Sequence, residues 1–473
     1  MEIFIRRVVI ENFKSLEHVE LDLRPGINLL VGPNAGGKSN LLEALYFLRL
    51  ALVEGLRSVP YMPHAPHYWD PLDVVFMRDP GRTIRYRLDF LCRNLDRGVE
   101  HDVSLEVGFN VSPDRATLLP TMFTLSYGDD LTLSVSEAGV EVKVREDLFA
   151  EVEDRLKSNP NYGGFLSKFV ATGEKGGFLT FKAGPNLWAD YGTNLVLGVL
   201  RSLSSFPAVA GYMGPKGIGS VDMLIHPVGW VPLIFRVRPA SRNTAKGFES
   251  PLKLPVATLY DLLNALEHVV MLKHPDMRAL REPKTLGEAE KLDIRASNLA
   301  PVLLSLMSKG RLSRIEEAVA ELFPGTRVRP QLQHGRVALL VEEGGVELPP
   351  PNVADGLLKV LAILAAVELG PSLLLIDELE NSLHARLIEY VVDVLNSLSV
   401  PVLVATHSPA VVDLVGPERT IVVERGEGGG TRVSRIKDPE GLSRKLRELG
   451  VTFSDYVMYR ATWWGEGNEA PSG

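Results

Sequence analysis

Cysteine, long apolar runs and a positive net charge are scarce or missing in this sequence. Cys92 is the one cysteine among 473 residues, which excludes an intrachain disulfide framework and a cysteine-rich zinc site. No stretch reaches the roughly 18 consecutive apolar residues of a membrane-spanning helix, and the start of the chain lacks the apolar core of a signal peptide. We therefore expect a folded, cytoplasmic protein with no membrane partner. The formal net charge of −8 means that nucleic-acid binding would need a local basic surface.

The chain does contain a phosphate-binding pattern near its start. Residues 32–40, GPNAGGKSN, follow the apolar run INLLV and precede LLEALYFL, which has helical spacing. In the pattern G-x-x-x-x-G-K-[ST], glycines let backbone amides surround phosphate oxygens, and the helix N-terminus adds a partial positive charge. Lys38 is expected to reach the β and γ phosphates, and the Ser39 hydroxyl to ligate magnesium. With Gly32 and Gly37, these residues predict a site for a nucleoside triphosphate.

A second pattern supplies the acidic residues that such a site needs. In PSLLLIDELENSLHARL, the apolar run at 373–376 is typical of a buried parallel strand and ends at Asp377 and Glu378. We expect Asp377 to hold magnesium, and Glu378 to orient or deprotonate the attacking water. The alternative is that both acids only cap the helix that apolar spacing predicts over residues 382–398.

The next apolar run, in VPVLVATHSPAVVDLV, ends in Thr406, His407 and Ser408. Ligands collect at the carboxyl ends of parallel strands in doubly wound sheets. Alone, His407 would be a capping or packing residue. Beside the two preceding motifs it is expected to contact the γ phosphate.

Taken together, these motifs resemble one protein family. The segments NFKS, GPNAGGKSN, NVADGLLKVLAILAAVE, LLLIDELENSLHARL and LVATHSP resemble the RecF/SMC-like branch of ABC-type ATPases, and within it the short stand-alone AAA family members without a long coiled coil. The resemblance implies an α/β P-loop NTPase fold, that of an ABC-type ATPase head with an antiparallel β subdomain and a helical insertion. It also implies magnesium-dependent ATP hydrolysis by two heads that dimerise around ATP.

The resemblance also assigns residues to roles. Glu378, His407 and Lys38 would be catalytic, and Ser39 and Asp377 would hold magnesium. The loop with Asn381 and His384 would lie at the dimer interface. The residues that would contact ATP are Gly32, Asn34, Gly36, Gly37, Lys38, Ser39, Asn40, Lys14, Ser15, Asp355 and Gly356.

Two features depart from the family pattern. Where relatives often show Ser-Asp-Gly in the signature motif, this chain has Ala354, Asp355 and Gly356, with Lys359 at a position that is usually basic. A hydroxyl contact to the γ phosphate of the other head is thereby lost, although backbone amides can still face a phosphate. A glutamine that senses the γ phosphate is also missing. The two glutamines, Gln331 and Gln333, lie in a predicted hairpin, so Asp70 or Asp73 is our candidate for that role.

The expected organisation has three parts. Residues 1–145 form the first part of the head, with the phosphate loop and an antiparallel sheet over about 82–145. Residues 146–330 are an inserted mixed region that is helical over about 256–325. Residues 331–473 complete the head with the signature, the acidic strand end and His407, and close with a hairpin and a helix.

Weaker patterns bear on partners. His64, His67 and Asp70 have metal-like spacing in a proline-rich loop, but we do not expect a metal there. Two basic runs are expected to be solvated faces, with DNA contact as the alternative; they are Arg236, Arg238, Arg242 and Lys246, and Lys309, Arg311 and Arg314. The favoured partner is DNA. The alternative function is a slow nucleotide-operated switch that acts through an unknown protein partner in a defence or toxin-type system.

Overall fold

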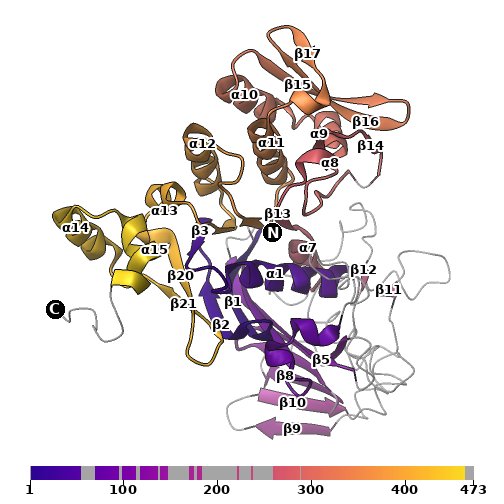
Figure 1. Cartoon of the computed structure of the whole chain (residues 1–473). Helices are drawn as coiled ribbons and strands as arrows, with labels where there is room; N and C mark the ends of the chain where they lie inside the picture. Colours follow the sequence, from indigo (N-terminus) through magenta and orange to yellow (C-terminus); the bar gives the residue numbers. More distant parts are fainter. Residues whose placement is uncertain are drawn as a thin grey trace. The chain divides into compact units, whose positions relative to one another are not determined.

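The chain divides into two compact units, which are described separately (Figure 1). The first comprises Met1–Asp22 and Phe47–Glu267, and the second Leu23–Tyr46 and His268–Gly473. The computed structural model describes residues 2–54, 70–94, 99–112, 118–136, 139–146, 170–174, 178–183, 221–222, 236–237, 259–287 and 289–463. The expected division at 145 and 330 is not tested by these units and stays a prediction.

The first unit is built on an antiparallel sheet of nine strands, in the order β2-β1-β4-β5-β6-β7-β8-β10-β9. Alternate side chains of β4, from Ile84 to Cys92, are buried, as the two-residue period of a strand requires. The sheet predicted over about 82–145 is thus confirmed. The strands are β1 (Glu2–Phe13), β2 (Leu16–Asp22), β4 (Ile84–Asn94), β5 (Val99–Val111), β6 (Leu118–Tyr127), β7 (Leu131–Ser136), β8 (Gly139–Arg145), β9 (Val170–Glu174) and β10 (Phe178–Ala183).

The second unit contains a six-stranded sheet in the order β13-β18-β19-β3-β20-β21. All neighbours pair in parallel except β20 and β21, which form the predicted hairpin. Leu30 of β3 lies opposite Ala405 of β19, which lies opposite Asp377 of β18, so these three strands end at the same edge of the sheet. The strands are β3 (Gly26–Val31), β13 (Val269–Lys273), β18 (Leu373–Asp377), β19 (Pro401–Ala405), β20 (Thr420–Arg425) and β21 (Thr431–Arg435).

Strand β13 corrects one prediction. The stretch over about 256–325 was expected to be helical, and most of it is, but residues 269–273 pair in parallel with β18 at the edge of the sheet. The residues VVMLK are too few to show a helical or strand period, so pairing with β18 decides their conformation. The helices of this stretch are α7 (Leu259–Glu267), which belongs to the first unit, and α8 (Met277–Arg281), α9 (Leu299–Ser308) and α10 (Ser313–Leu322), which belong to the second.

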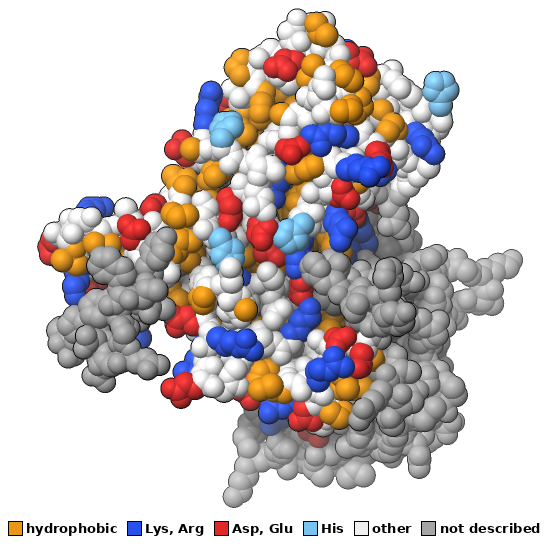
Figure 2. All heavy atoms as spheres, viewed as in Figure 1, with side chains coloured by type: hydrophobic (Ala, Val, Ile, Leu, Met, Phe, Trp, Pro, Cys, Tyr) orange, Lys and Arg blue, Asp and Glu red, His pale blue; other side chains and the backbone are white. Residues whose placement is uncertain are grey.

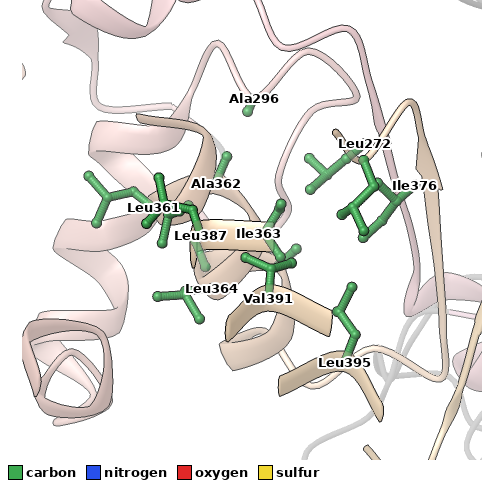
Figure 3. Packing of buried hydrophobic residues seen from close by; sticks show 14 of the residues in the cluster. Leu272, Ala296, Leu361, Ala362, Ile363, Leu364, Ile376, Leu387, Val391 and Leu395 are labelled. Carbon is green, nitrogen blue, oxygen red and sulfur yellow. The ribbon is translucent and has the colours of Figure 1, made fainter. Parts of the chain in front are cut away.

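A buried helix, α11 (Asp355–Glu368), lies at the centre of the second unit's core. It contacts α8, α9, α10 and α12 (Ala385–Asn396), and apolar side chains cover it on nearly all sides. Figure 3 shows side chains of α11, α12, β13 and β18 in this cluster. Because burying a leucine or isoleucine side chain contributes about 1.5–3 kcal/mol, this cluster fixes α11 and α12 relative to the sheet.

The remaining elements complete the second unit. A small antiparallel sheet contains β14 (Lys284–Thr285), β15 (Thr326–Gln333), β16 (Arg336–Glu343) and β17 (Val346–Leu348). Gln331 and Gln333 lie in its β15–β16 hairpin, as predicted. Three helices follow the parallel strands: α13 (Pro409–Val415), α14 (Pro439–Leu449) and α15 (Phe453–Trp463). In the part of the chain that the structure describes, no helix is both long enough and apolar enough to cross a membrane.

Candidate active site

The phosphate loop joins β3 to α1 (Lys38–Arg49), as its sequence predicts. Its glycines are required by close packing against the β20–β21 hairpin. A Cβ on Gly32 would lie 1.9 Å from the Val423 carbonyl oxygen, and one on Gly37, at φ 114°, would lie 2.1 Å from the Thr431 hydroxyl. The Thr431 hydroxyl donates a hydrogen bond of 2.9 Å to the Gly36 carbonyl. The hairpin therefore holds the loop in shape.

Lys38 is buried at the first turn of α1. Its Nζ donates to the carbonyl oxygens of Gly32, at 2.7 Å, and Pro33, at 3.0 Å. Burial lowers the pKa of Lys38 to about 8, while nearby carboxylates, Asp377 first among them, oppose that change. An ammonium group that is poorly hydrated and bound only to carbonyl dipoles is well prepared to bind an anion such as a phosphate.

The two predicted acids lie at the end of β18. Asp377 is the last residue of that strand and is 4% exposed. Glu378 follows at φ 55°, a left-handed conformation that costs a residue other than glycine about 1–3 kcal/mol and is concentrated at functional sites. The N-cap of α12 is His384, so the alternative in which the acids only cap this helix is wrong.

His407 follows β19 and lies near the same acids. Burial lowers the pKa of His407, and the positive charge of Lys38 lowers it further. Its imidazole is therefore neutral at pH 7 and has one N–H to donate and one nitrogen that accepts. Because β3, β18 and β19 end at the same edge of the sheet, the three predicted motifs that follow these strands meet there.

Sequence reasoning missed Glu380, which joins the two strand ends. Its carboxylate accepts a hydrogen bond of 2.8 Å from the Thr406 hydroxyl and one of 2.7 Å from the His407 backbone N–H. Glu380 thereby fixes the backbone that carries His407. Its position two residues after Glu378 was the only signal in the sequence.

Sequence reasoning also missed the end of β13. The Lys273 ammonium lies 2.5 Å from the Glu43 carboxylate of α1 and 3.6 Å from that of Asp377, and all three side chains are at most 6% exposed. The next residue, His274, places Nδ1 3.1 Å from Oε2 of Glu378. No sequence motif marks these residues, because pairing of β13 with β18 brings them to the site.

The signature segment begins α11. Its N-cap, Ala354, has no side-chain hydrogen bond to offer, and the Asp355 carboxylate pairs with the guanidinium group of Arg281. Arg281 also donates 2.5 Å to the Val353 carbonyl. Lys359, one turn on, donates 3.3 Å to the Glu378 carbonyl oxygen, so α11 contacts the end of β18 directly. Contacts of Asp355 and Gly356 with ATP stay predictions.

Four further predicted residues, Lys14, Ser15, Asp70 and Asp73, belong to the first unit. Lys14 and Ser15 form the turn between β1 and β2 in the first unit, and their contact with nucleotide stays a prediction. Asp70 and Asp73 both pair with Arg78, and Asp70 also caps the 3-10 turn Pro71–Val74. These contacts favour a structural role over the sensing role that we proposed for these two acids.

Three further side-chain sets have been considered as partner sites. His64, His67 and most of the first basic run lie outside the described residues. In the second run, Arg311 and Arg314 lie 3.5 and 3.6 Å from the Glu368 carboxylate, and Lys309 lies 3.4 Å from Glu290, which fits a solvated face. Among the residues that the structure describes, no cluster of three metal-ligating side chains is present.

This site is that of a P-loop nucleotide-binding protein, and two segments of the chain match known family models. The model "AAA ATPase domain" matches residues 3–54, which contain the phosphate loop. The model "AAA domain, putative AbiEii toxin, Type IV TA system" matches residues 245–413, which contain the signature, Asp377, Glu378 and His407. These two matches support the predicted likeness to RecF/SMC-like ABC-type ATPases, and each covers less than half of the chain.

Similarity to individual proteins is local. The DNA replication and repair protein RecF of Streptococcus agalactiae serotype Ia is 34% identical over 65 residues, which is 14% of this chain and 18% of that protein. The DNA double-strand break repair Rad50 ATPase of Methanopyrus kandleri is 39% identical over 87 residues, 18% of this chain and 10% of that one. The chain thus matches less than a fifth of the length of either relative.

A solved structure gives a weak global likeness. The Smc head domain with an extended coiled coil, bound to the C-terminal domain of ScpA and derived from Pyrococcus furiosus, is 13% identical, with a TM-score of 0.41 over 95% of this chain and 100% of that one. A score this low does not by itself establish a shared fold. The sheet order and the motifs described above carry the fold assignment.

Proposed function

We propose that the protein is a magnesium-dependent ATP hydrolase. The observation that carries this proposal is the meeting of Lys38, the Asp377–Glu378 pair and His407 at one edge of the parallel sheet. A phosphate-binding cation, a buried carboxylate, a partly exposed carboxylate and a neutral histidine are the groups that phosphoryl transfer to water requires.

The residues present fit a magnesium ion. Mg²⁺ is usually bound through one or two carboxylates together with substrate phosphates, and here Asp377 supplies a buried carboxylate and Ser39 a hydroxyl at the start of α1. When bound with ATP, the ion would neutralise charge that develops on the β and γ phosphates. Lys38 would exchange its carbonyl partners in the loop for phosphate oxygens.

The chain's own residues then account for hydrolysis. The oxygen of a water molecule attacks the γ phosphorus and the bond to the β–γ bridging oxygen breaks, so ADP and inorganic phosphate form. Glu378 accepts the proton of the attacking water. His407 donates its N–H to a γ-phosphate oxygen, and Glu380 holds the backbone of His407 in place for that contact.

We further propose that two heads dimerise around ATP and that turnover is coupled to DNA. Support comes from the relatives, one named for DNA replication and repair and one for double-strand break repair. Binding would use local patches, because Lys and Arg side chains alternate with Asp and Glu on the face seen in Figure 2, and its described atoms show no continuous basic band. The cytoplasmic location remains an expectation.

A second candidate is a slow nucleotide-operated switch that acts through a protein partner. One matched family model carries the description of a putative AbiEii toxin of a type IV toxin–antitoxin system. The net charge of −8 and Ala354 in the signature also favour this candidate over a DNA-coupled motor.

The test is ATP turnover as a function of protein concentration, with and without double-stranded DNA. The DNA-coupled dimer predicts a rate per protein that rises with concentration and rises again with DNA. Turnover that is independent of both concentration and DNA favours the switch. Lys38→Ala is the control, because it removes the phosphate-binding charge, and turnover equal to wild type in this variant would contradict ATP hydrolysis at this site.

A further inference from the structure

Strand β13 brings two residues to the acidic strand end by its register. It is the edge strand of the parallel sheet, and Lys273 lies opposite Asp377. The residue that follows β13 is His274, and the residue that follows β18 is Glu378, so these two residues are also neighbours. Each acid at the end of β18 thus has a basic side chain beside it from β13.

The side chains of His274 and Glu378 are in close polar contact. Nδ1 of His274 lies 3.1 Å from Oε2 of Glu378, and because an ionised carboxylate only accepts, Nδ1 carries the proton in this contact. The Asn381 side-chain amide donates to the same oxygen. The Asn381 amide and the His274 imidazole, which come from different segments, therefore both restrict the rotation of the Glu378 carboxylate.

Both residues are held by the backbone in an unfavourable conformation. His274 has φ 46° and Glu378 has φ 55°, and left-handed φ values are uncommon for side chains of this size. The Lys273 N–H donates 2.7 Å to the Ile294 carbonyl, and the Glu378 N–H donates 3.0 Å to the Ala405 carbonyl. The fold thus fixes both strand ends and turns both side chains to the same place, which is the pattern of a preorganised site.

The pair His274–Glu378 is more exposed than the neighbouring ion pair Lys273–Asp377. The side chains of His274 and Glu378 are 46% and 35% exposed, whereas those of Lys273 and Asp377 are 6% and 5% exposed. A surface contact of this kind contributes little to stability. Its position next to the carboxylate that would accept a proton from water gives it a role in the reaction instead.

We propose that His274 is a positioning residue for ATP hydrolysis, which holds the Glu378 carboxylate in the orientation that accepts the proton of the attacking water. This inference rests on the proposed function, since it needs Glu378 to act as the base. His274 acts through Glu378 and not through the nucleotide, so its removal should affect the chemical step and leave nucleotide binding intact.

The test compares six forms of the full chain: wild type, His274→Ala, His274→Asn, His334→Ala, Glu378→Gln and the double variant Glu378→Gln/His274→Ala. The asparagine amide can donate from nearly the position of Nδ1, so it is the conservative variant. His334 is the matched control, because it is an exposed histidine that also has a left-handed φ, 50°, but lies at the tip of the β15–β16 hairpin. Initial rates over a range of ATP concentrations give kcat and KM, and a fluorescent ATP analogue gives binding.

We expect His274→Ala to lower kcat about tenfold with KM and analogue binding within about twofold, because small misplacements of a catalytic group have effects of this order or larger. His274→Asn should retain at least about a third of wild-type kcat, and His334→Ala should match wild type. In a Glu378→Gln background, His274→Ala should cause no further loss, since residues that act as one unit are not additive.

Wild-type kcat in His274→Ala, or equal losses in the alanine and asparagine variants accompanied by weakened analogue binding, would overturn the positioning role. A further tenfold loss in the Glu378→Gln background would also overturn it, because His274 would then act independently of Glu378. Failure of the proposed function has a different result, in which wild-type protein binds the analogue but shows no turnover.

Discussion

The inner and outer contacts between β13 and β18 differ in burial, although they are one residue apart. The inner contact places Lys273 between Glu43 and Asp377 with almost no exposure, and the outer contact places His274 beside Glu378 at the surface. The register of β13 on β18 therefore places a buried ion pair one residue away from an exposed polar contact, and we propose that the first stabilises the fold and the second supports hydrolysis. Variants at the two positions should separate these roles.

The largest effect on stability is expected at the inner contact. Lys273→Met leaves the carboxylates of Glu43 and Asp377 buried without their cation, and removing one partner of a buried ion pair costs about 3–5 kcal/mol. The free energy of unfolding, measured by urea denaturation, should fall by that amount. The double variant Lys273→Met/Glu43→Gln should recover part of the loss, because one of the unpaired charges is gone.

The control is an exposed lysine with an acidic neighbour. Lys309 lies 3.4 Å from Glu290, and both side chains are about half exposed or more. Lys309→Met should change the free energy of unfolding by less than about 1 kcal/mol. Equal losses in Lys273→Met and Lys309→Met would show that the inner contact is not the structural cluster described here.

A second lysine approaches the strand end from α11 and predicts a pH dependence. Lys359 is 1% exposed, and burial lowers its pKa from 10.5 to about 8, against the opposing pull of Glu380 and other carboxylates. Below pH 8 the folded protein holds a charged, buried ammonium group, which reduces stability. Between pH 8 and 10.5 the unfolded chain binds this proton and the folded protein does not, so stability rises with pH.

The measurement is the difference in free energy of unfolding between wild type and Lys359→Met. Taking this difference cancels the titration of all other groups, which the two proteins share. From pH 8 to 10 the wild type should gain on the variant by up to about 1.4 kcal/mol per pH unit. A difference that stays constant from pH 7 to 10 would mean that Lys359 keeps its ordinary pKa.

The smallest effect is expected at the signature, where the N-cap of α11, Ala354, has no side-chain group that can cap the helix. Ala354→Ser restores a side-chain cap at the start of α11 and should raise the free energy of unfolding by about 1 kcal/mol. Ala385→Ser, at the first residue of α12 and not at its N-cap, should give no such gain. If both serines have the same effect, capping is not what Ala354 lacks.

The sequence predicted those parts of the site in which the important residues lie within one short motif. The phosphate loop, Asp377–Glu378 and His407 each follow a short apolar run, and their chemistry can be recognised from local pattern. Lys273, His274 and Glu43 could not be predicted in the same way, because they meet only through the pairing of β13 with β18 and the position of α1. Strand β13 has only five residues, too few for an alternating pattern to be recognised in the sequence.

For the fold too, the length of a pattern decided whether an element could be predicted. Alternating patterns were long enough to predict the antiparallel sheet and both hairpins, β15–β16 and β20–β21. Glu380 shows the opposite case, in which a residue inside a recognised motif makes a contact with Thr406 that depends on the neighbouring strand. Local pattern therefore predicts the reacting groups, whereas strand register determines which side chains contact them.

The central claim is that Glu378 is the base for ATP hydrolysis at the end of β18. The most direct measurement is magnesium-dependent phosphate release by wild type, Glu378→Gln and the exposed control Glu389→Gln, together with ATP binding by each. The account predicts that Glu378→Gln binds ATP within about threefold of wild type but releases phosphate at least about a hundredfold more slowly, while Glu389→Gln is unchanged. Phosphate release by Glu378→Gln at the wild-type rate would contradict it.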